Sequence, residues 1–73
     1  MNAKEWVAAY AEQLGVEQPT AAEFTAILDL AAEAAHASDR LAAPVACWLA
    51  ARADLSLDES LALARAIAQS GEA

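Results

Sequence analysis

The side chains with the most versatile chemistry in this chain are a single cysteine, Cys47, and a single histidine, His36. A thiol becomes a nucleophile when a neighbouring base takes its proton, and that pairing needs a third group to orient the base and a pocket that excludes water. A chain of 73 residues offers little room for either requirement. We therefore expect Cys47 to be an inert helix cysteine and the chain to have no enzymatic activity.

Metal and nucleotide chemistry are not expected either. Cys47 has no second cysteine, and His36 no second histidine, with which to form a zinc site. The two glycines, Gly15 and Gly71, are too far apart to form a phosphate-binding loop. The neighbouring carboxylates of Asp58 and Glu59 would diverge on a helix, which is typical of first-turn residues that face the helix dipole. The sequence thus predicts no catalytic residue, no metal and no cofactor.

His36 and Arg40 lie on either side of an expected turn. A histidine near the end of a helix is stabilised as a cation by the helix dipole, and an arginine can grip a carboxylate or phosphate with two hydrogen bonds. One interpretation is therefore an anion-binding pair. The other is a histidine that caps the helix and an Arg40 that pairs with Asp39 or Glu33, and we favour it because it needs no ligand.

Trp6 and Trp48 are two large aromatic residues in a small chain. Tryptophan is enriched where one protein anchors another, so both residues are candidates for contacts with a partner. Both also fall on the apolar stripes of expected helices. Packing in the core is therefore the favoured interpretation for each.

The first two helices are predicted from residues that start and end helices. Asn2 with Glu5, and Thr20 with Glu23, have the three-residue spacing of a capping box. Gly15 suits the left-handed position that ends a helix. We expect the first helix to run from near Asn2 to Gly15, and the second to follow Thr20 and fade by Ala37. Residues 38–40 should form the next turn.

The last two helices are predicted in the same way. Leu41-Ala42-Ala43-Pro44 should open a short third helix, because a proline is tolerated in the first turn. Ser56 and Glu59 form a third capping box and should open the fourth helix after a break at Asp54 and Leu55. We expect residues 70–73 to form a frayed tail.

These elements predict an all-α fold, a compact bundle of four short helices that forms a single domain over residues 1–73. The connectors are short, so successive helices should pack roughly antiparallel. The expected core is Trp6, Tyr10, Leu14, Phe24, Ile27, Leu28, Val45, Trp48, Leu49, Leu61 and Ile67. Because 23 of the 73 residues are alanine, this core is thin, and a partner or a second copy could complete it.

Charge narrows the classes of partner. Eleven acidic residues against four basic ones give a net charge of −7, which disfavours direct binding to nucleic acid or to an anionic membrane. The chain has no apolar segment long enough to span a bilayer, and its start does not resemble a secretion signal. A cytoplasmic location is the expectation.

One segment carries a resemblance to a known family. The motif Ala35-His36-x-x-x-Arg40-x-Ala42-Ala43-Pro44-Val45, followed by an apolar helix, resembles a small actinobacterial helical domain of unknown function. Residues 5–7, 14–16 and 28–31 extend the similarity over most of the chain. That domain is found alone or fused to molybdenum cofactor guanylyltransferase, the enzyme that makes molybdopterin guanine dinucleotide.

The resemblance implies an association with molybdenum cofactor maturation but not guanylyl transfer itself, because the nucleotide-binding machinery belongs to the other domain. The predicted function is a non-enzymatic accessory or docking module. It would bind the guanylyltransferase or a related maturation factor through helix faces and the turn from His36 to Pro44, with Trp6 and Trp48 as further contacts. Two alternatives remain: a domain that binds a small anionic ligand or cofactor through His36 and Arg40, and a structural homodimer.

Overall fold

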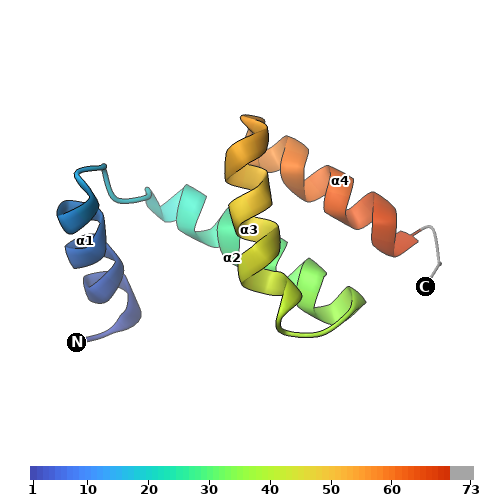
Figure 1. Cartoon of the computed structure of the whole chain (residues 1–73), viewed down its shortest axis with the longest axis horizontal. Coiled ribbons are helices and arrows are strands. Elements are labelled where there is room, and N and C mark those ends of the chain that lie inside the picture. The colour runs from blue at the N-terminus through green and yellow to red at the C-terminus, as the bar shows by residue number, and fades with distance from the viewer. Residues whose placement is uncertain (70–73) are drawn as a thin grey trace.

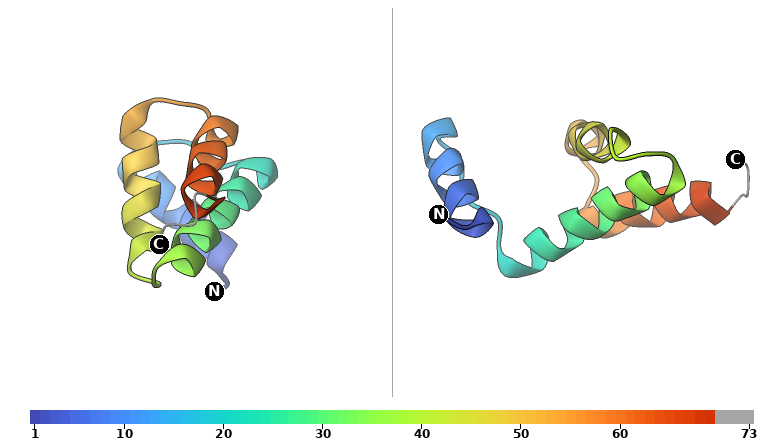
Figure 2. Two further views of the ribbon diagram at one scale, coloured as in Figure 1. Left: turned by 90° about the vertical axis from the view of Figure 1, so that its right-hand side faces the viewer. Right: turned by 90° about the horizontal axis from the view of Figure 1, so that it is seen from below.

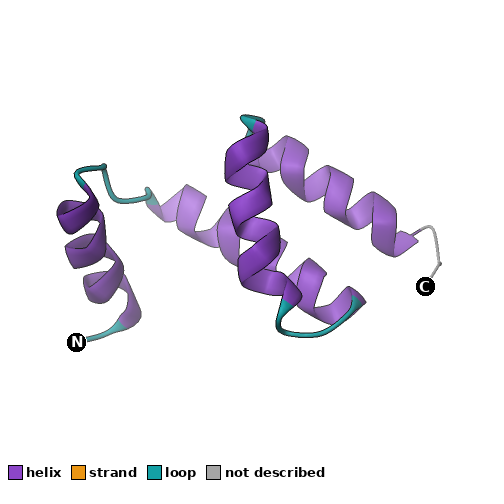
Figure 3. Cartoon of the chain, in the orientation of Figure 1, coloured by secondary structure: helices purple, strands orange, loops and turns teal. Residues whose placement is uncertain are grey.

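The computed structural model describes residues 1–69 of the chain. This range forms four α-helices and no strand: α1 (Ala3–Leu14), α2 (Ala21–Ala37), α3 (Ala42–Ala53) and α4 (Leu57–Gln69) (Figures 1 and 3). The predicted all-α bundle of four short helices is confirmed. The frayed tail expected at residues 70–73 lies outside the described residues.

Three of the helices begin at the predicted capping boxes. In each box the side-chain oxygen of the first residue accepts a hydrogen bond from the backbone N–H of a glutamate three residues on. The glutamate carboxylate accepts one from the backbone of the first residue in return. The pairs are Asn2 with Glu5, Thr20 with Glu23, and Ser56 with Glu59, at distances of 2.8–3.1 Å. These local bonds set the helix starts where the sequence places them.

Two helices end in a residue with left-handed backbone. Gly15 follows α1 with a φ of 77°, and Asp54 follows α3 with a φ of 61°. The Gly15 N–H donates to the Glu12 carbonyl and the Val16 N–H donates to the Ala11 carbonyl, which satisfies the last turn of α1. Glycine adopts this backbone without strain, whereas the Cβ of Asp54 makes it costly.

Helix α2 is the centre of the bundle and packs against both α3 and α4. Figures 1 and 2 show α3 crossing α2, while α4 lies beside α2 and runs in the same direction. An ion pair joins α2 to α4, with the Nε of Arg65 3.2 Å from a carboxylate oxygen of Glu33. The antiparallel packing predicted for successive helices is therefore wrong for α2 and α3, which cross each other.

Helix α1 stands at one end of the molecule, apart from α3 and α4 (Figure 1; Figure 2, right). It reaches α2 mainly around Val7, which lines an apolar pocket with Pro19 and Phe24. The Lys4 amino group lies 5.8 Å from the centre of the Phe24 ring. Ala11 is the buried residue of this helix. The predicted antiparallel packing of α1 on α2 is wrong, because the connector turns α1 away from the body.

The core is smaller than predicted. Its buried hydrophobic residues are Ala11, Leu30 and Leu61, and among the described residues no large side chain is completely buried. Of the predicted core, Leu61 is confirmed, and Phe24 and Ile27 are half-buried. The prediction is wrong for eight residues that are at least half exposed: Trp6, Tyr10, Leu14, Leu28, Val45, Trp48, Leu49 and Ile67.

The positions of the alanines on α3 explain why the large side chains of this helix are exposed. The residues that α3 half-buries toward the body are small: Ala42, Ala43, Ala46, Cys47 and Ala50. Small side chains let two helix backbones approach closely, so α3 lies on α2 through its alanines. The larger side chains then occupy the opposite side of the same helix, where the body cannot cover them.

The two left-handed positions give a matched pair of predictions. Gly15→Ala should lower the free energy of unfolding by about 1 kcal/mol, because only backbone strain opposes it; a Cβ at Gly15 would meet nothing within 4 Å. Asp54→Gly should raise it by a few tenths of a kcal/mol, because relief of strain is partly offset by a more flexible unfolded chain. Thermal unfolding followed by circular dichroism measures both, and the same sign for the two changes would contradict the assignment.

Candidate functional site

The turn between α2 and α3 holds His36 and Arg40. Its backbone is fixed locally: the Ser38 hydroxyl donates to the Ala34 carbonyl at 3.1 Å, and an Asp39 carboxylate oxygen accepts from the Leu41 N–H at 2.8 Å. His36 lies in the last turn of α2, as predicted. The turn is therefore rigid without help from the two basic side chains.

The side chains of His36 and Arg40 are exposed. Among residues 1–69 neither makes a side-chain hydrogen bond or an ion pair. The predicted pairing of Arg40 with Glu33 is wrong, because Glu33 pairs with Arg65 on α4 instead. Asp39 is also engaged, as the hydrogen-bond acceptor for the backbone of the turn. Arg40 is thus available to a group from outside these residues.

Directly after this turn, α3 presents a surface that we call the α3 face, formed by Leu41, Val45, Trp48, Leu49 and Arg52. Its four apolar side chains are 54–71% exposed. Their helical spacing places them in one stripe along the helix. The Arg52 guanidinium lies 4.7 Å from the centre of the Trp48 ring, a cation–π contact that orients the indole. Pro44 lies in the first turn of this helix and is also exposed.

Cys47 lies on the opposite, body-facing side of α3. Its Sγ donates to the Ile27 carbonyl of α2 at 4.0 Å, and the residue is partly buried. Burial raises the pKa of the Cys47 thiol above its ordinary value of 9.0. The protonated thiol is the unreactive form. The geometry therefore supports a packing role for Cys47.

A second exposed stripe lies on α1, and we call it the α1 stripe: Trp6, Tyr10 and Leu14, each four residues after the last. The three side chains are 54%, 50% and 57% exposed. The rings of Trp6 and Tyr10 lie 5.1 Å apart and are tilted by 31°. The structure does not bring Trp6 and Trp48 together, since they lie on separate helices at different parts of the molecule (Figure 1).

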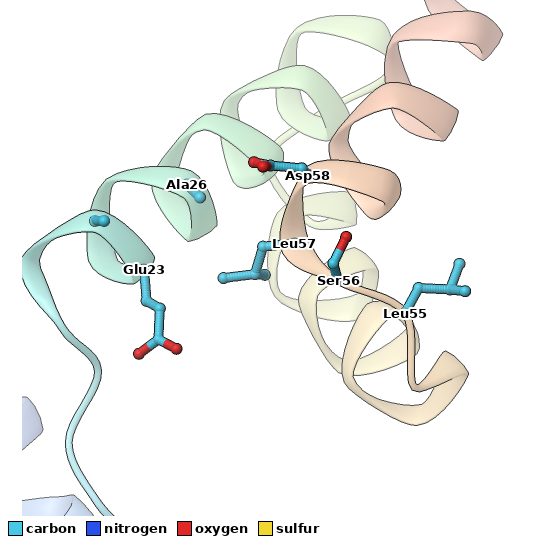
Figure 4. A pocket seen from close by; sticks show the side chains of 7 residues that line it. Glu23, Ala26, Leu55, Ser56, Leu57 and Asp58 are labelled. Atoms are coloured by element: carbon cyan, nitrogen blue, oxygen red, sulfur yellow. The ribbon is translucent and has the colours of Figure 1, made fainter.

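Two cavities within the described residues lie away from the turn and from the α3 face. An apolar pocket of about 190 Å³ between α1 and α2 is lined by Val7, Pro19, Phe24, Ile27 and Leu28. A wider groove of about 450 Å³ lies between the starts of α2 and α4, and Figure 4 shows the Asp58 carboxylate pointing toward Ala26 while the Glu23 carboxylate points away from Asp58. Neither cavity is lined by His36 or Arg40. The groove therefore offers no paired carboxylates for acid–base chemistry.

Residues 1–69 contain neither a cluster of metal-binding side chains nor a membrane-spanning helix. No three histidine, cysteine or carboxylate residues gather where they could hold a metal ion. Within the same range no helix has the length and apolar character that crossing a membrane requires.

The fold and its surfaces define a small all-α domain whose most prominent features are two exposed apolar stripes. The profile of the family described as "Domain of unknown function (DUF6457)" matches residues 1–72, and the chain belongs to this family. No curated protein matches the chain, and no solved structure matches it.

From the sequence, Val45, Trp48 and Leu49 of the α3 face were all expected in the core, with contact to a partner as the second interpretation for Trp48. A signal for the whole face was nevertheless present. This helix has two apolar sides, one formed by alanines and one by larger residues. Arg52 lies four residues after Trp48, on the side with the larger residues. A cation on a large apolar stripe favours the exposed side.

Cys47 gives a prediction about pH. A thiol whose pKa is higher in the folded chain than in the unfolded chain stabilises the fold below its ordinary pKa, and this stabilisation is lost as the pH rises through that range. The free energy of unfolding of the wild-type chain should therefore fall, relative to that of Cys47→Ala, as the pH rises above 9.0. Urea unfolding of both chains at a series of pH values measures this difference. A difference that grows in favour of the wild type would contradict the burial of the thiol.

Proposed function

We propose that this domain is a non-enzymatic docking module whose protein partner is molybdenum cofactor guanylyltransferase or a related maturation factor. The partner is inferred from the resemblance of the His36–Val45 motif to the actinobacterial domain that occurs alone or fused to that enzyme. The mode of binding is inferred from the α3 face and the turn before it. The module would dock the enzyme without taking part in guanylyl transfer.

The observation that supports docking is the exposure of the α3 face. Protein interfaces are anchored by a few aromatic, arginine and large apolar side chains near their centre. Trp48 is 59% exposed and is held by Arg52, so it is arranged as such an anchor before any partner binds. A rigid anchor loses less conformational freedom on binding than a mobile one.

Charge favours a particular kind of partner surface. The helix α3 contains no acidic residue, although the chain as a whole has a net charge of −7. Two of the four lysine and arginine residues, Arg40 and Arg52, lie at the start and end of this face. The complementary surface would be an apolar groove with acidic residues at its rim.

The alternative function, binding of a small anion by His36 and Arg40, has a narrower basis. Both side chains are exposed, and neither lines the two cavities described above. A small-molecule site normally encloses its ligand in a concave pocket. The docking function therefore has the stronger support, and anionic ligands serve as a comparison in its test.

Calorimetric titration of the domain into the guanylyltransferase of the same organism tests the proposal. We expect saturable binding by the wild-type domain. Trp48→Ala should weaken the affinity about 30-fold, as the loss of a central aromatic anchor does, and Arg40→Ala about 5-fold. Circular dichroism should show that both variants keep the helix content of the wild type, because both side chains are exposed.

Trp6→Ala is the matched control, since it removes the other half-exposed tryptophan from a different helix. The sequence predicts Trp6 as a further contact, but this residue lies on a helix apart from the α3 face, so Trp6→Ala should bind the enzyme as the wild type does. Absence of binding by the wild-type domain would overturn the proposed partner. Binding of guanine nucleotide or molybdopterin alone, with loss on Arg40→Ala, would favour the anion-binding function instead.

A further inference from the structure

The α1 stripe has no cover within the described chain. Trp6, Tyr10 and Leu14 lie on the same side of α1, whereas Val7 lines a pocket with residues of α2, and Ala11 is buried beside the residues that follow the helix. The two aromatic rings contact each other and are otherwise half exposed.

Such a helix needs more support than α2 gives it. An α-helix of about 12 residues is only marginally stable in water when it stands alone, even in alanine-rich sequences, and α1 has 12 residues. Its capping box and its C-terminal glycine stabilise its two ends only. Most helix stability in proteins comes instead from burial of an apolar face, and the apolar face of α1 is open.

The surface area of the chain leads to the same conclusion. The chain exposes 5639 Å². A folded monomer of 7.6 kDa is expected to expose about 4,300 Å². The excess of about 1,300 Å² is more than the ~800 Å² that each partner buries in a standard protein interface. The chain as a whole therefore exposes more excess surface than one interface of standard size would bury.

We propose that the α1 stripe is the contact between two copies of this chain in a symmetric homodimer. The support that α1 lacks is needed in every folded copy, whether or not the enzyme is present. A second copy is the one partner that always accompanies the chain in equal amount. In a two-fold contact the same stripe serves both partners, so Trp6 and Tyr10 of each copy gain an apolar cover at once.

Charge on α1 permits this contact between two chains that each have a net charge of −7. The two acidic residues of α1 are Glu5 and Glu12. With 3.6 residues per turn, both fall on the side of the helix away from Tyr10, the middle of the stripe. Two α1 helices can therefore meet through their stripes while their carboxylates remain in water.

This dimer is independent of the proposed docking function, because it uses α1 and leaves the α3 face open. The two tryptophans make the surfaces separately observable. In a Trp48→Phe chain the fluorescence reports on Trp6 alone, and in a Trp6→Phe chain it reports on Trp48 alone. Failure of the dimer and failure of docking would therefore be recognised as different results.

The first experiment measures mass and fluorescence over a range of concentrations. Sedimentation equilibrium should give the wild type a mass approaching twice 7.6 kDa as the concentration rises. The emission of Trp6 in the Trp48→Phe chain should shift to the blue over the same range, as burial of an indole does. The emission of Trp48 in the Trp6→Phe chain should not shift. A wild-type mass of 7.6 kDa throughout would overturn the proposal.

Matched charge variants then place the contact. Trp6→Glu introduces a carboxylate into the α1 stripe and should leave a monomer with reduced α1 helix content, because the dimer supports that helix. Trp48→Glu makes the same change on the α3 face and should leave the dimer intact. Retention of the dimer by Trp6→Glu, or its loss in Trp48→Glu alone, would overturn the assignment to α1. The wild-type mass decides whether a dimer exists, however well either variant folds.

Discussion

The close approach of α3 to α2 through small side chains is the constraint on which the rest of this structure depends. Ala43, Ala46 and Ala50 face the body, and the Cys47 thiol reaches the Ile27 carbonyl of α2. Alanine loses no side-chain entropy on burial and lets helix axes come near one another. The same choice gives the body little apolar volume of its own, so it is built on few buried residues, chiefly Leu30 and Leu61.

The exposed α3 face follows from this constraint, and the exposed α1 stripe has a separate cause. When small residues occupy the inner side of α3, the larger ones must lie on its outer side, and Trp48 becomes accessible with Arg52 over its ring. When α1 is turned away by its connector, its stripe of Trp6, Tyr10 and Leu14 is left open as well. An exposed apolar patch of this kind marks an interaction site in a soluble protein. The two proposals give each stripe one partner: the enzyme would bind the α3 face, and a second copy of the chain would bind the α1 stripe.

The helix boundaries could be predicted from the sequence because the interactions that fix them are local. A capping box such as Thr20 with Glu23, and a left-handed glycine such as Gly15, involve residues a few positions apart.

The candidate site could be predicted from the sequence only in part. His36 lies in the last turn of α2 as expected. Glu33, one of the two partners expected for Arg40, instead forms an ion pair with Arg65 of α4, which lies 32 positions further along the chain. Such competition between distant residues has no local signal.

The prediction of the core was wrong for a related reason. The sequence of α3 has two apolar sides, and only the packing of this helix on α2 determines which of them is buried.

The orientation of α3 is the claim on which the α3 face and the proposed docking depend, and the accessibility of Trp48 measures it most directly. Acrylamide quenching of the Trp6→Phe chain, free of any partner, reports on Trp48 alone. The structure, in which this side chain is 59% exposed, predicts strong quenching and the red-shifted emission of an indole in water. Weak quenching with blue-shifted emission would mean that α3 turns its large side chains inward, and would contradict the packing of this helix through its alanines.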